Sequence, residues 1–401
     1  MTERLYYDNA YLKSFEALVT SCREAKGGGY LITLDRSAFY PTSGGQPFDT
    51  GCIGAAKVTD VEADERGEVV HRTDAPLKPG ENVHCEIDWP RRYDHMQQHG
   101  GEHILAGSLQ ALLGGFTHGL HIGAEVCTID VTMPDGRTHL TEEELRSLGE
   151  LANRRVQQAA PIRCWFPSSD EMARLPLRKA PTVTEHIRVV MAGDFECVAC
   201  GGTHPKNTGE IGLIIPLGAA PARGKLRLSF LCGMRAIKYM QQVQHSAGRA
   251  GAALSAPPEE LGQAAEQLKS EQAALRAQLS ALKKENASLR AKTLKETAQP
   301  LSAKVRLVSA ELPDANLLQG VAAELVAEDG ILALLSAPGE DSGSRLLFAR
   351  SANLPHDMGA LLRACGARGG GRPDFAQGVS KEPEALTRAE KLVQEENGHE
   401  S

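Results

Sequence analysis

The chain has 401 residues, of which 41% are hydrophobic, so it can bury two or three separate cores. Its formal net charge of −7 argues against sequence-blind binding to nucleic acid through overall charge, although a local basic surface could still bind phosphates. The nine cysteines are scattered and odd in number, unlike a secreted disulfide framework, and neither an apolar leader nor a membrane-length apolar run occurs. We therefore expect a soluble, untargeted protein of the cytoplasm.

Residues 1–90 are predicted to form a small β-barrel. Short apolar stretches such as Tyr30–Leu34 and Val83–Trp89 alternate with Gly, Pro and Asp. This alternation is typical of short strands joined by tight turns.

Residues 91–256 are predicted to form an α+β domain, because helical and strand periodicities alternate there. Met96–Leu113 and Leu140–Ala159 carry apolar residues at helical spacing, whereas Val126–Val131 alternates like a strand. The pair Pro257–Pro258 marks the end of this domain, since proline stops one helix and is tolerated in the first turn of the next.

A coiled-coil helix is predicted for residues 257–298. Five leucines fall seven residues apart at one core position of a heptad: Leu261, Leu268, Leu275, Leu282 and Leu289. The other core position is occupied by Ala265, Gln272, Leu279 and Asn286. Charged and amide side chains border this narrow stripe on both sides. The pattern favours self-association or an antiparallel hairpin with a neighbouring helix, and an amphipathic helix lying on its own domain is the alternative.

Residues 299–401 are predicted to form a small α/β C-terminal domain with a tail. Apolar stretches at Val305–Ser309 and Gly330–Leu335 flank a helical pattern over Asn316–Ala327. A glycine-rich segment follows at 366–371, and we expect 381–401 to be a charged, partly disordered tail. The whole chain is thus predicted to be an α+β multidomain protein.

Two short motifs together predict a metal site. His99 and His103 are four residues apart and project from one helix face, and Cys200-Gly-Gly-Thr-His204 adds a thiolate and an imidazole on a glycine-bearing turn. One sulfur and three imidazole nitrogens suit Zn²⁺ better than magnesium or calcium, which prefer oxygen ligands. A histidine pair at this spacing, taken alone, is more often a solvated or hydrogen-bonded helix face than a metal site. Cys197, which forms a CxxC with Cys200, is interpreted as a bystander, with ligation or redox chemistry as alternatives.

The order of these motifs, followed by Thr208-Gly-Glu-Ile-Gly, resembles the editing domain of alanyl-tRNA synthetase, which AlaX proteins carry free-standing. Upstream, the segment 39–51 with Gly44-Gly45-Gln46 resembles the glycine-rich motif of the family's N-terminal barrel. Downstream, the segment 366–378 is similar to the DHH-associated C-terminal domain of alanyl-tRNA synthetase and long AlaX proteins. The resemblance runs from about residue 5 to about 380 and is to the long-form AlaX family.

The resemblance implies a trans-editing hydrolase that deacylates mischarged alanine tRNA carrying serine, with glycine as a weaker target. It implies Zn²⁺ held by His99, His103, Cys200 and His204. Gln46, Ser37 and Thr203 are then the candidate catalytic or recognition groups, and Ser37 stands where the family senses the hydroxyl of the wrong amino acid. A homodimer through the coiled coil or the C-terminal domain is a further expectation. Five basic residues are candidates for contacting tRNA phosphates: Arg223, Lys225, Arg227, Arg368 and Arg372.

Three other functions compete with this interpretation. A DHH-type phosphoesterase needs an Asp-His-His motif, and here only Asp94-His95-Met96 occurs. A zinc-stabilised tRNA-binding coiled-coil protein without catalysis would use the same four ligands as a structural site. Editing of the threonyl-tRNA synthetase type shares the two-motif zinc pattern, although the C-terminal signature belongs with the alanine system.

Overall fold

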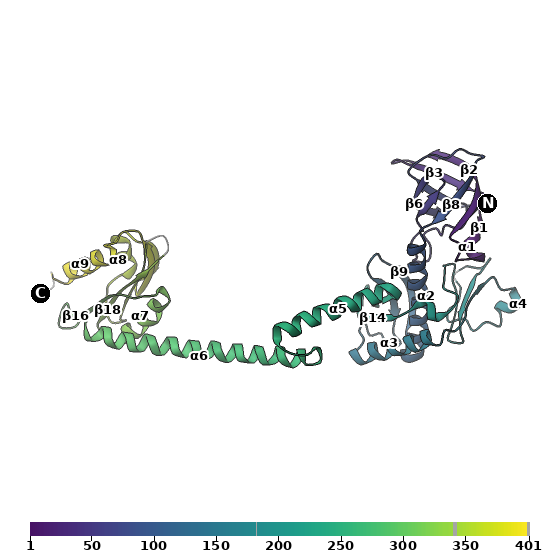
Figure 1. Cartoon of the computed structure of the whole chain (residues 1–401). Helices are drawn as coiled ribbons and strands as arrows, with labels where there is room; N and C mark the ends of the chain where they lie inside the picture. Colours follow the sequence, from purple (N-terminus) through teal and green to yellow (C-terminus); the bar gives the residue numbers. More distant parts are fainter. Residues whose placement is uncertain (182, 340–342, 399–401) are drawn as a thin grey trace. The chain divides into compact units, whose positions relative to one another are not determined.

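The computed structural model describes residues 1–181, 183–339 and 343–398 (Figure 1). The chain divides into two compact units, Met1–Arg249 and Ala250–Ser401. None of the helices in the described residues is long and apolar enough to cross a membrane. The mixed α+β multidomain architecture predicted from the sequence is confirmed, while the finer limits at 90, 256 and 298 stay predictions.

The first unit begins with a closed six-stranded barrel, as predicted. Its strands follow one another around the barrel in the order β2 (Ser14–Glu24), β3 (Tyr30–Leu34), β7 (Val69–Thr73), β6 (Ala56–Ala63), β5 (Gly51–Ile53) and β8 (Asn82–Ile87). In β8, Val83, Cys85 and Ile87 are buried while the residues between them are exposed. This period of two is what places one face of each strand inside the barrel. The short elements β1 (Glu3–Arg4), α1 (Leu5–Asp8) and β4 (Arg36–Ser37) lie at its start.

Helix α2 (Trp89–Leu113) follows the barrel directly and carries half of the predicted metal site. It begins seven residues earlier than the predicted Met96, because the Asp88 side chain accepts a hydrogen bond from the Arg91 amide and proline stands in the first turn. Gly114, with φ of 66°, ends it. The helix is buried over its central turns, and Gly101 has no room for a side chain, since a Cβ there would lie 2.1 Å from Cys232 Sγ.

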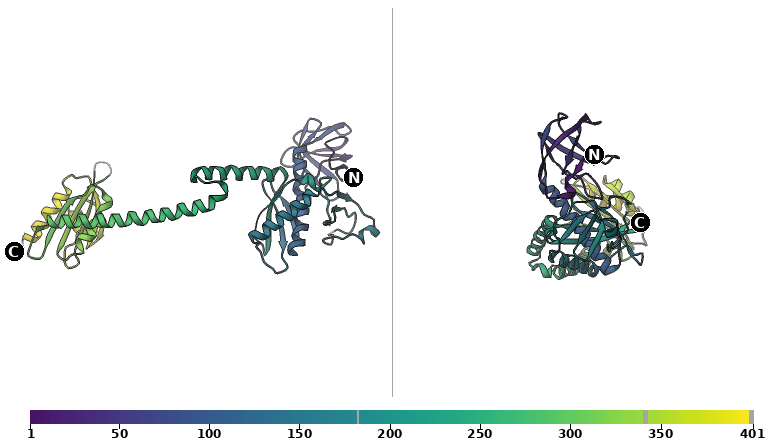
Figure 2. Two further views of the ribbon diagram at one scale, coloured as in Figure 1. Left: turned by 60° about the horizontal axis from the view of Figure 1, so that its bottom comes forward. Right: turned by 90° about the vertical axis from the view of Figure 1, so that its right-hand side faces the viewer.

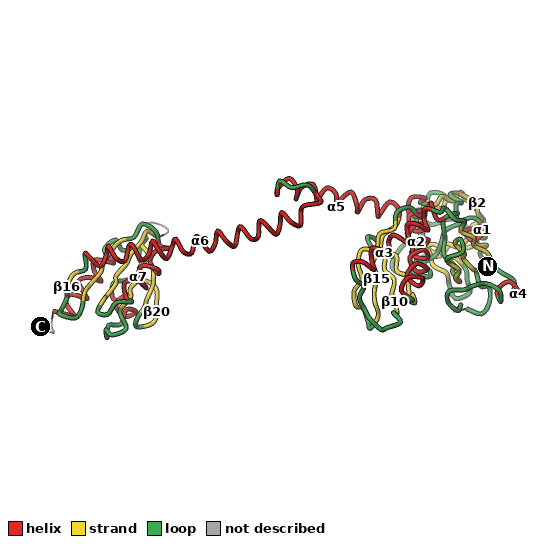
Figure 3. Tube along the Cα trace, turned by 90° about the horizontal axis from the view of Figure 1, so that it is seen from below, coloured by secondary structure: helices red, strands yellow, loops and turns green. Residues whose placement is uncertain are grey.

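A four-stranded sheet forms the main core of the first unit with α2 and α3 (Glu142–Gln157). Its order is β14 (Ile214–Ala222), β15 (Lys225–Cys232), β10 (Cys127–Thr132) and β9 (Phe116–Ile122). Figure 3 shows the two helices beside the yellow strands of this sheet. A separate three-stranded sheet, β11 (Ile162–Trp165), β12 (Val189–Ala192) and β13 (Glu196–Ala199), leads into the second metal motif. Three further helical segments complete this region: α4 (Ser169–Met172), η1 (Thr208–Ile211) and α5 (Gly233–Leu254).

The second unit contains a six-stranded sheet with helices on both faces (Figure 2). The strand order is β16 (Gln299–Pro300), β17 (Arg306–Glu311), β18 (Ile331–Pro338), β19 (Ser344–Arg350), β21 (Phe375–Ser380) and β20 (Arg368–Arg372). One face packs against α7 (Leu318–Val326) and the end of α6 (Leu261–Glu296), with η2 (Pro258–Glu260) and η3 (Ala315–Leu317) preceding these helices. The other face packs against α8 (Met358–Ala364) and α9 (Ala385–Gly398).

The prediction that 381–401 is a charged, partly disordered tail is wrong for most of the segment that the structure describes. Helix α9 occupies most of it, and Ala385, Ala389 and Val393 are buried in the C-terminal core. These residues are four apart and so share one helix face. The high charge of the segment belongs to the other faces of the helix, while residues 399–401 lie outside the described residues.

The heptad segment is a single helix, α6, as its periodicity predicts. Its leucine stripe is open: Leu268, Leu275, Leu282 and Leu289 are 55–64% exposed. A different face, carrying Ala287 and Ala291, packs against the second unit's own core. The face that contacts the domain is therefore not the face that carries the leucines.

Candidate metal centre

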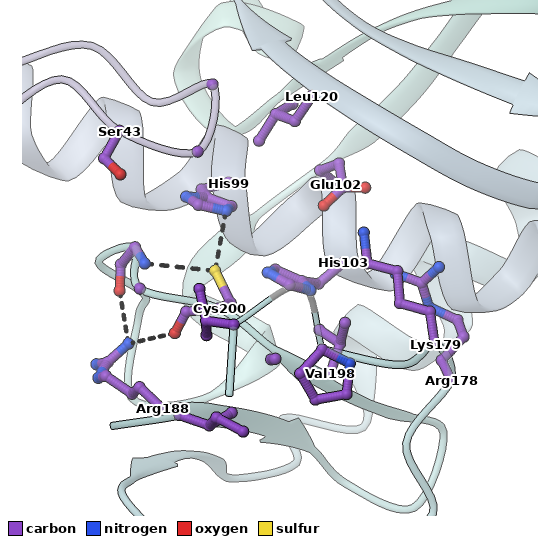
Figure 4. Close-up of a pocket in the computed structure, with 18 of the residues that line it drawn as sticks. Ser43, His99, Glu102, His103, Leu120, Arg178, Lys179, Arg188, Val198 and Cys200 are labelled. Atoms are coloured by element: carbon purple, nitrogen blue, oxygen red, sulfur yellow. Dashed lines mark hydrogen bonds between the residues drawn. The ribbon is translucent and has the colours of Figure 1, made fainter. Parts of the chain in front are cut away.

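The four predicted ligands converge on one point. His99 and His103 project from α2, and Cys200 and His204 follow β13. Their ligand atoms all lie within 4.8 Å of one another. Cys200 Sγ is 3.3 Å from His99 Nε2 (Figure 4). It is 3.4 Å from His204 Nε2. A tetrahedral zinc would set such sulfur–nitrogen pairs about 3.6 Å apart. These side chains can therefore hold one metal ion such as zinc.

The cysteine turn is held against α2 by a close backbone approach. A Cβ at position 202 would lie 2.2 Å from the His99 ring, so only glycine fits there. The buried Arg188 guanidinium donates to the carbonyl oxygens of Cys200, at 3.1 Å, and Gly202, at 2.8 Å. The Gly202 amide donates to Cys200 Sγ at 3.3 Å. The turn thus stabilises negative charge on the sulfur.

Gln46 of the barrel segment orients the His99 ring through the nitrogen that does not face Cys200. Its Oε1 accepts from His99 Nδ1 at 2.8 Å and from the Thr203 amide at 3.2 Å, and its Nε2 donates to Thr203 Oγ1 at 2.8 Å. Because an amide oxygen can only accept, His99 carries its proton on Nδ1 and leaves the Nε2 lone pair facing Cys200. Gln46 and Thr203 are fully buried and act through His99.

His103 has an acidic neighbour. Its Nδ1 lies 3.6 Å from Glu196 Oε1, and both oxygens of Glu196 accept from Arg178 Nε at 2.9 Å. Within the described residues, His103 Nε2 is buried without a hydrogen-bond partner. A buried polar nitrogen without a partner is costly, so an ion at this position fits the residues present.

The pKa shifts of Cys200 and His204 favour the forms of these side chains that bind a metal. Burial opposes ionisation of the Cys200 thiol, but the neighbouring His99, His204 and His103 outweigh it and hold the pKa of Cys200 well below its usual value. Burial lowers the pKa of His204. For His103, burial is outweighed by Cys200 and Glu196, which raise its pKa. The site therefore offers a thiolate and at least one neutral imidazole, the forms that bind zinc.

A cavity of about 590 Å³ opens beside the metal group, and His99, His103 and Cys200 are part of its wall. The barrel segment contributes Tyr40 and the turn 43–45 to the wall, and β9 contributes Leu120. A Cβ on Gly45, whose φ is +83°, would lie 2.0 Å from the Leu120 carbonyl oxygen. The glycine motif therefore brings the barrel against β9 and closes one side of the cavity.

Ser37 lies apart from the metal group and the cavity. Its side chain is fully buried in the barrel, where its Oγ is 2.8 Å from His71 Nε2 and accepts from the Phe39 amide at 3.1 Å. It is not part of the cavity wall in the described residues. Cys197, in β13, is buried outside the metal group. The geometry thus brings Gln46 and Thr203 to the metal group and leaves Ser37 and Cys197 apart from it.

Several cavity residues were not singled out from the sequence. Arg178, Lys179 and Arg188 line the cavity, but they come from an irregular segment whose spacing gives no signal. Glu102, next to His103, had a visible signal, since position 102 shares the helix face of position 99. Among the predicted phosphate contacts, Arg227 is paired with Asp130 at 2.7 Å. Arg368 and Arg372 are exposed on β20.

Comparison with known proteins shows what this chain is similar to. Residues 2–91 match the model for tRNA synthetases class II (A), and residues 187–228 match that for the threonyl and alanyl tRNA synthetase second additional domain. The alanine–tRNA ligase of Pyrococcus abyssi is 33% identical over 98% of this chain and 44% of its own length. The ligase of Archaeoglobus fulgidus is 34% identical over 98% of this chain and 43% of its own length.

The chain is therefore related to alanyl-tRNA synthetases and spans less than half the length of these relatives. The second matched region contains Cys200 and His204 of the metal group. A solved structure, the C-Ala domain from Aquifex aeolicus alanyl-tRNA synthetase, shares 21% identity over 24% of this chain and 95% of that chain. Its TM-score is 0.23, at which no common fold follows.

Proposed function

We propose that this chain is a zinc-dependent trans-editing aminoacyl-tRNA hydrolase of the long-form AlaX type. It removes serine, and more slowly glycine, from mischarged alanine tRNA. One observation carries the proposal: three members of a group of three imidazoles and one thiolate, namely His99, His103 and Cys200, lie in the wall of a cavity of about 590 Å³. Part of that group lies in the region similar to the second additional domain of threonyl and alanyl synthetases.

The residues around the cavity suit an aminoacyl ester. Zinc bound by the four ligands would polarise the ester carbonyl or acidify a water molecule. Gln46 holds the His99 ring, and the carboxylate of Glu196 lies beside His103. Lys179 and Arg188 bring positive charge to the wall, which favours the phosphate-bearing end of a tRNA.

A purely structural zinc site is the second candidate, because four protein ligands are typical of closed sites. The chain would then be a tRNA-binding coiled-coil protein without catalysis. The position of three ligands in a cavity wall favours the catalytic interpretation, since a structural ion needs no access from a cavity.

The experiment is deacylation by the purified chain. Ser-, Gly- and Ala-tRNA(Ala) are presented at equal concentration, with Ser-tRNA(Thr) as the test for threonyl-type editing. We expect hydrolysis in the order serine, glycine, alanine on tRNA(Ala), loss of activity with a chelator, and recovery with zinc. A protein that binds one zinc and tRNA(Ala) but hydrolyses none of these esters would be the scaffold instead.

A further inference from the structure

Glu102 is a carboxylate in the wall of the cavity that the metal group does not use. It follows His99 by three residues on α2 and directly precedes His103. Its side chain is nearly buried, with 7% of the residue exposed, yet it lines the cavity. Figure 4 shows Glu102 projecting from the helix that carries both histidines. A group bound by Glu102 would therefore lie next to the metal group.

The charges around Glu102 are of the opposite sign. Apart from the metal group and other histidines, the charged side chains of the wall in the described residues are Arg178, Lys179 and Arg188, and Glu102 is its only carboxylate there. Arg178 is already paired with Glu196, and Arg188 donates to backbone carbonyls. Within the described part of the chain, the Glu102 carboxylate forms no hydrogen bond or ion pair with another protein group. The carboxylate faces the cavity and has no protein partner, so it is free to pair with a cationic group of a ligand bound there.

We propose that Glu102 binds the α-ammonium group of the aminoacyl ester and so is a specificity-determining residue. This inference rests on the proposed function. A charged tRNA brings one cation into an otherwise anionic ligand, and that cation is the α-ammonium, one carbon away from the ester carbonyl. The cationic side chains of the wall face the phosphates, while Glu102 anchors the amino acid with its carbonyl towards the metal group.

The test is a binding measurement that does not depend on hydrolysis. Two probes are used: 3′-deoxy-3′-(seryl)amidoadenosine, in which an amide replaces the ester, and its N-acetyl derivative, which lacks the ammonium charge. Kd values are measured by calorimetry at about pH 6.5, where the α-amino group is protonated. The proteins are the zinc-loaded wild type, Glu102→Gln, and Glu125→Gln, which makes the same change at an exposed glutamate outside the cavity wall.

We expect the wild type and Glu125→Gln to bind the free amine roughly tenfold to a hundredfold more tightly than the N-acetyl probe, the range for a hydrogen bond between charged groups. Glu102→Gln should lose at least tenfold of this preference, and Glu102→Asp should keep part of it. Zinc content and melting temperature, measured on each variant, identify a change in folding. An unchanged preference in Glu102→Gln, or no preference in the wild type, overturns the inference.

The same proteins separate this inference from the proposed function. If the wild type deacylates Ser-tRNA(Ala) but Glu102→Gln retains the full preference for the free amine, the role of Glu102 is wrong and the reaction stands. If the preference depends on Glu102 but no ester is hydrolysed, the reaction is wrong and the ammonium site stands. If Glu102 instead acted as a base for water, Glu102→Gln would slow hydrolysis of Ser- and N-acetyl-Ser-tRNA(Ala) equally, which also overturns the inference.

Discussion

Replacing Gln46 with alanine tests how the barrel segment supports the metal group. The change removes the acceptor of the His99 Nδ1 proton at 2.8 Å and of the Thr203 amide at 3.2 Å, and the donor to Thr203 Oγ1 at 2.8 Å. Loss of such a partner typically weakens metal binding 10- to 100-fold, or about 1.4–2.8 kcal/mol. We therefore expect the zinc Kd of Gln46→Ala to rise by roughly that factor, measured by competition with a chromophoric chelator.

Gln98, which lies on α2 beside His99, provides a matched control for Gln46. It is also fully buried, and its amide exchanges two hydrogen bonds of 2.9 Å with the backbone of Cys232, away from the metal ligands. Gln98→Ala should lower the free energy of unfolding by about 1–3 kcal/mol and leave the zinc Kd unchanged. Equal zinc Kd values for the wild type and Gln46→Ala, or equal weakening in both variants, would refute the orienting role of Gln46.

Three further predictions concern the barrel and the long helix. Ser37→Ala should destabilise the barrel, because it leaves His71 Nε2 and the Phe39 amide without a partner. It should not change the ratio of the Ser-tRNA(Ala) to the Ala-tRNA(Ala) deacylation rate. A changed ratio would restore Ser37 as the hydroxyl sensor. Burial lowers the pKa of His71 to about 4. Between about pH 6.5 and 4 the unfolded chain therefore binds a proton at His71 that the folded chain does not. The free energy of unfolding should fall by up to about 3 kcal/mol over that range as the pH is lowered. Urea unfolding of wild type and His71→Phe measures this, and parallel pH profiles would count against it. For α6, we expect a parallel two-stranded coiled coil with a second copy of the chain. In that arrangement Glu271 and Glu285 would face Arg276 and Arg290 of the second copy. Antiparallel pairing would instead bring together four basic side chains of each helix, at positions 269, 276, 283 and 290. Sedimentation should show half the wild-type mass for the double variant Leu275→Lys with Leu282→Lys. The control double variant, Ala273→Lys with Ala277→Lys, should keep the wild-type mass. A wild-type chain that sediments as a monomer would contradict the coiled-coil dimer.

The barrel and the long helices could be predicted because their signals are local. Alternation at Val83, Cys85 and Ile87 and the heptad of α6 each depend on a few neighbouring residues. The spacing of His99 and His103 likewise follows from one helix turn. The tail was misjudged because a helix with one narrow buried face, at Ala385 and Ala389, has an ordinary charged composition.

The remainder of the site depends on contacts between distant segments. Gln46 meets Thr203 across 157 residues of sequence, and the Glu196 carboxylate reaches His103 from β13. Neither pairing leaves a periodic trace in the sequence. The place of Ser37 was not predictable for a related reason, because the register of a short strand decides whether a side chain faces the barrel core or the cavity.

If the proposed function is right, zinc at this group enables hydrolysis of the aminoacyl ester. This is tested most directly by titrating the metal-free chain with zinc and measuring the initial rate of Ser-tRNA(Ala) deacylation at each occupancy. We expect the rate to rise in proportion to bound zinc and to reach its plateau at one zinc per chain, with no rise in the Cys200→Ala variant. Full activity in the metal-free chain, or one bound zinc with no deacylation, would contradict it.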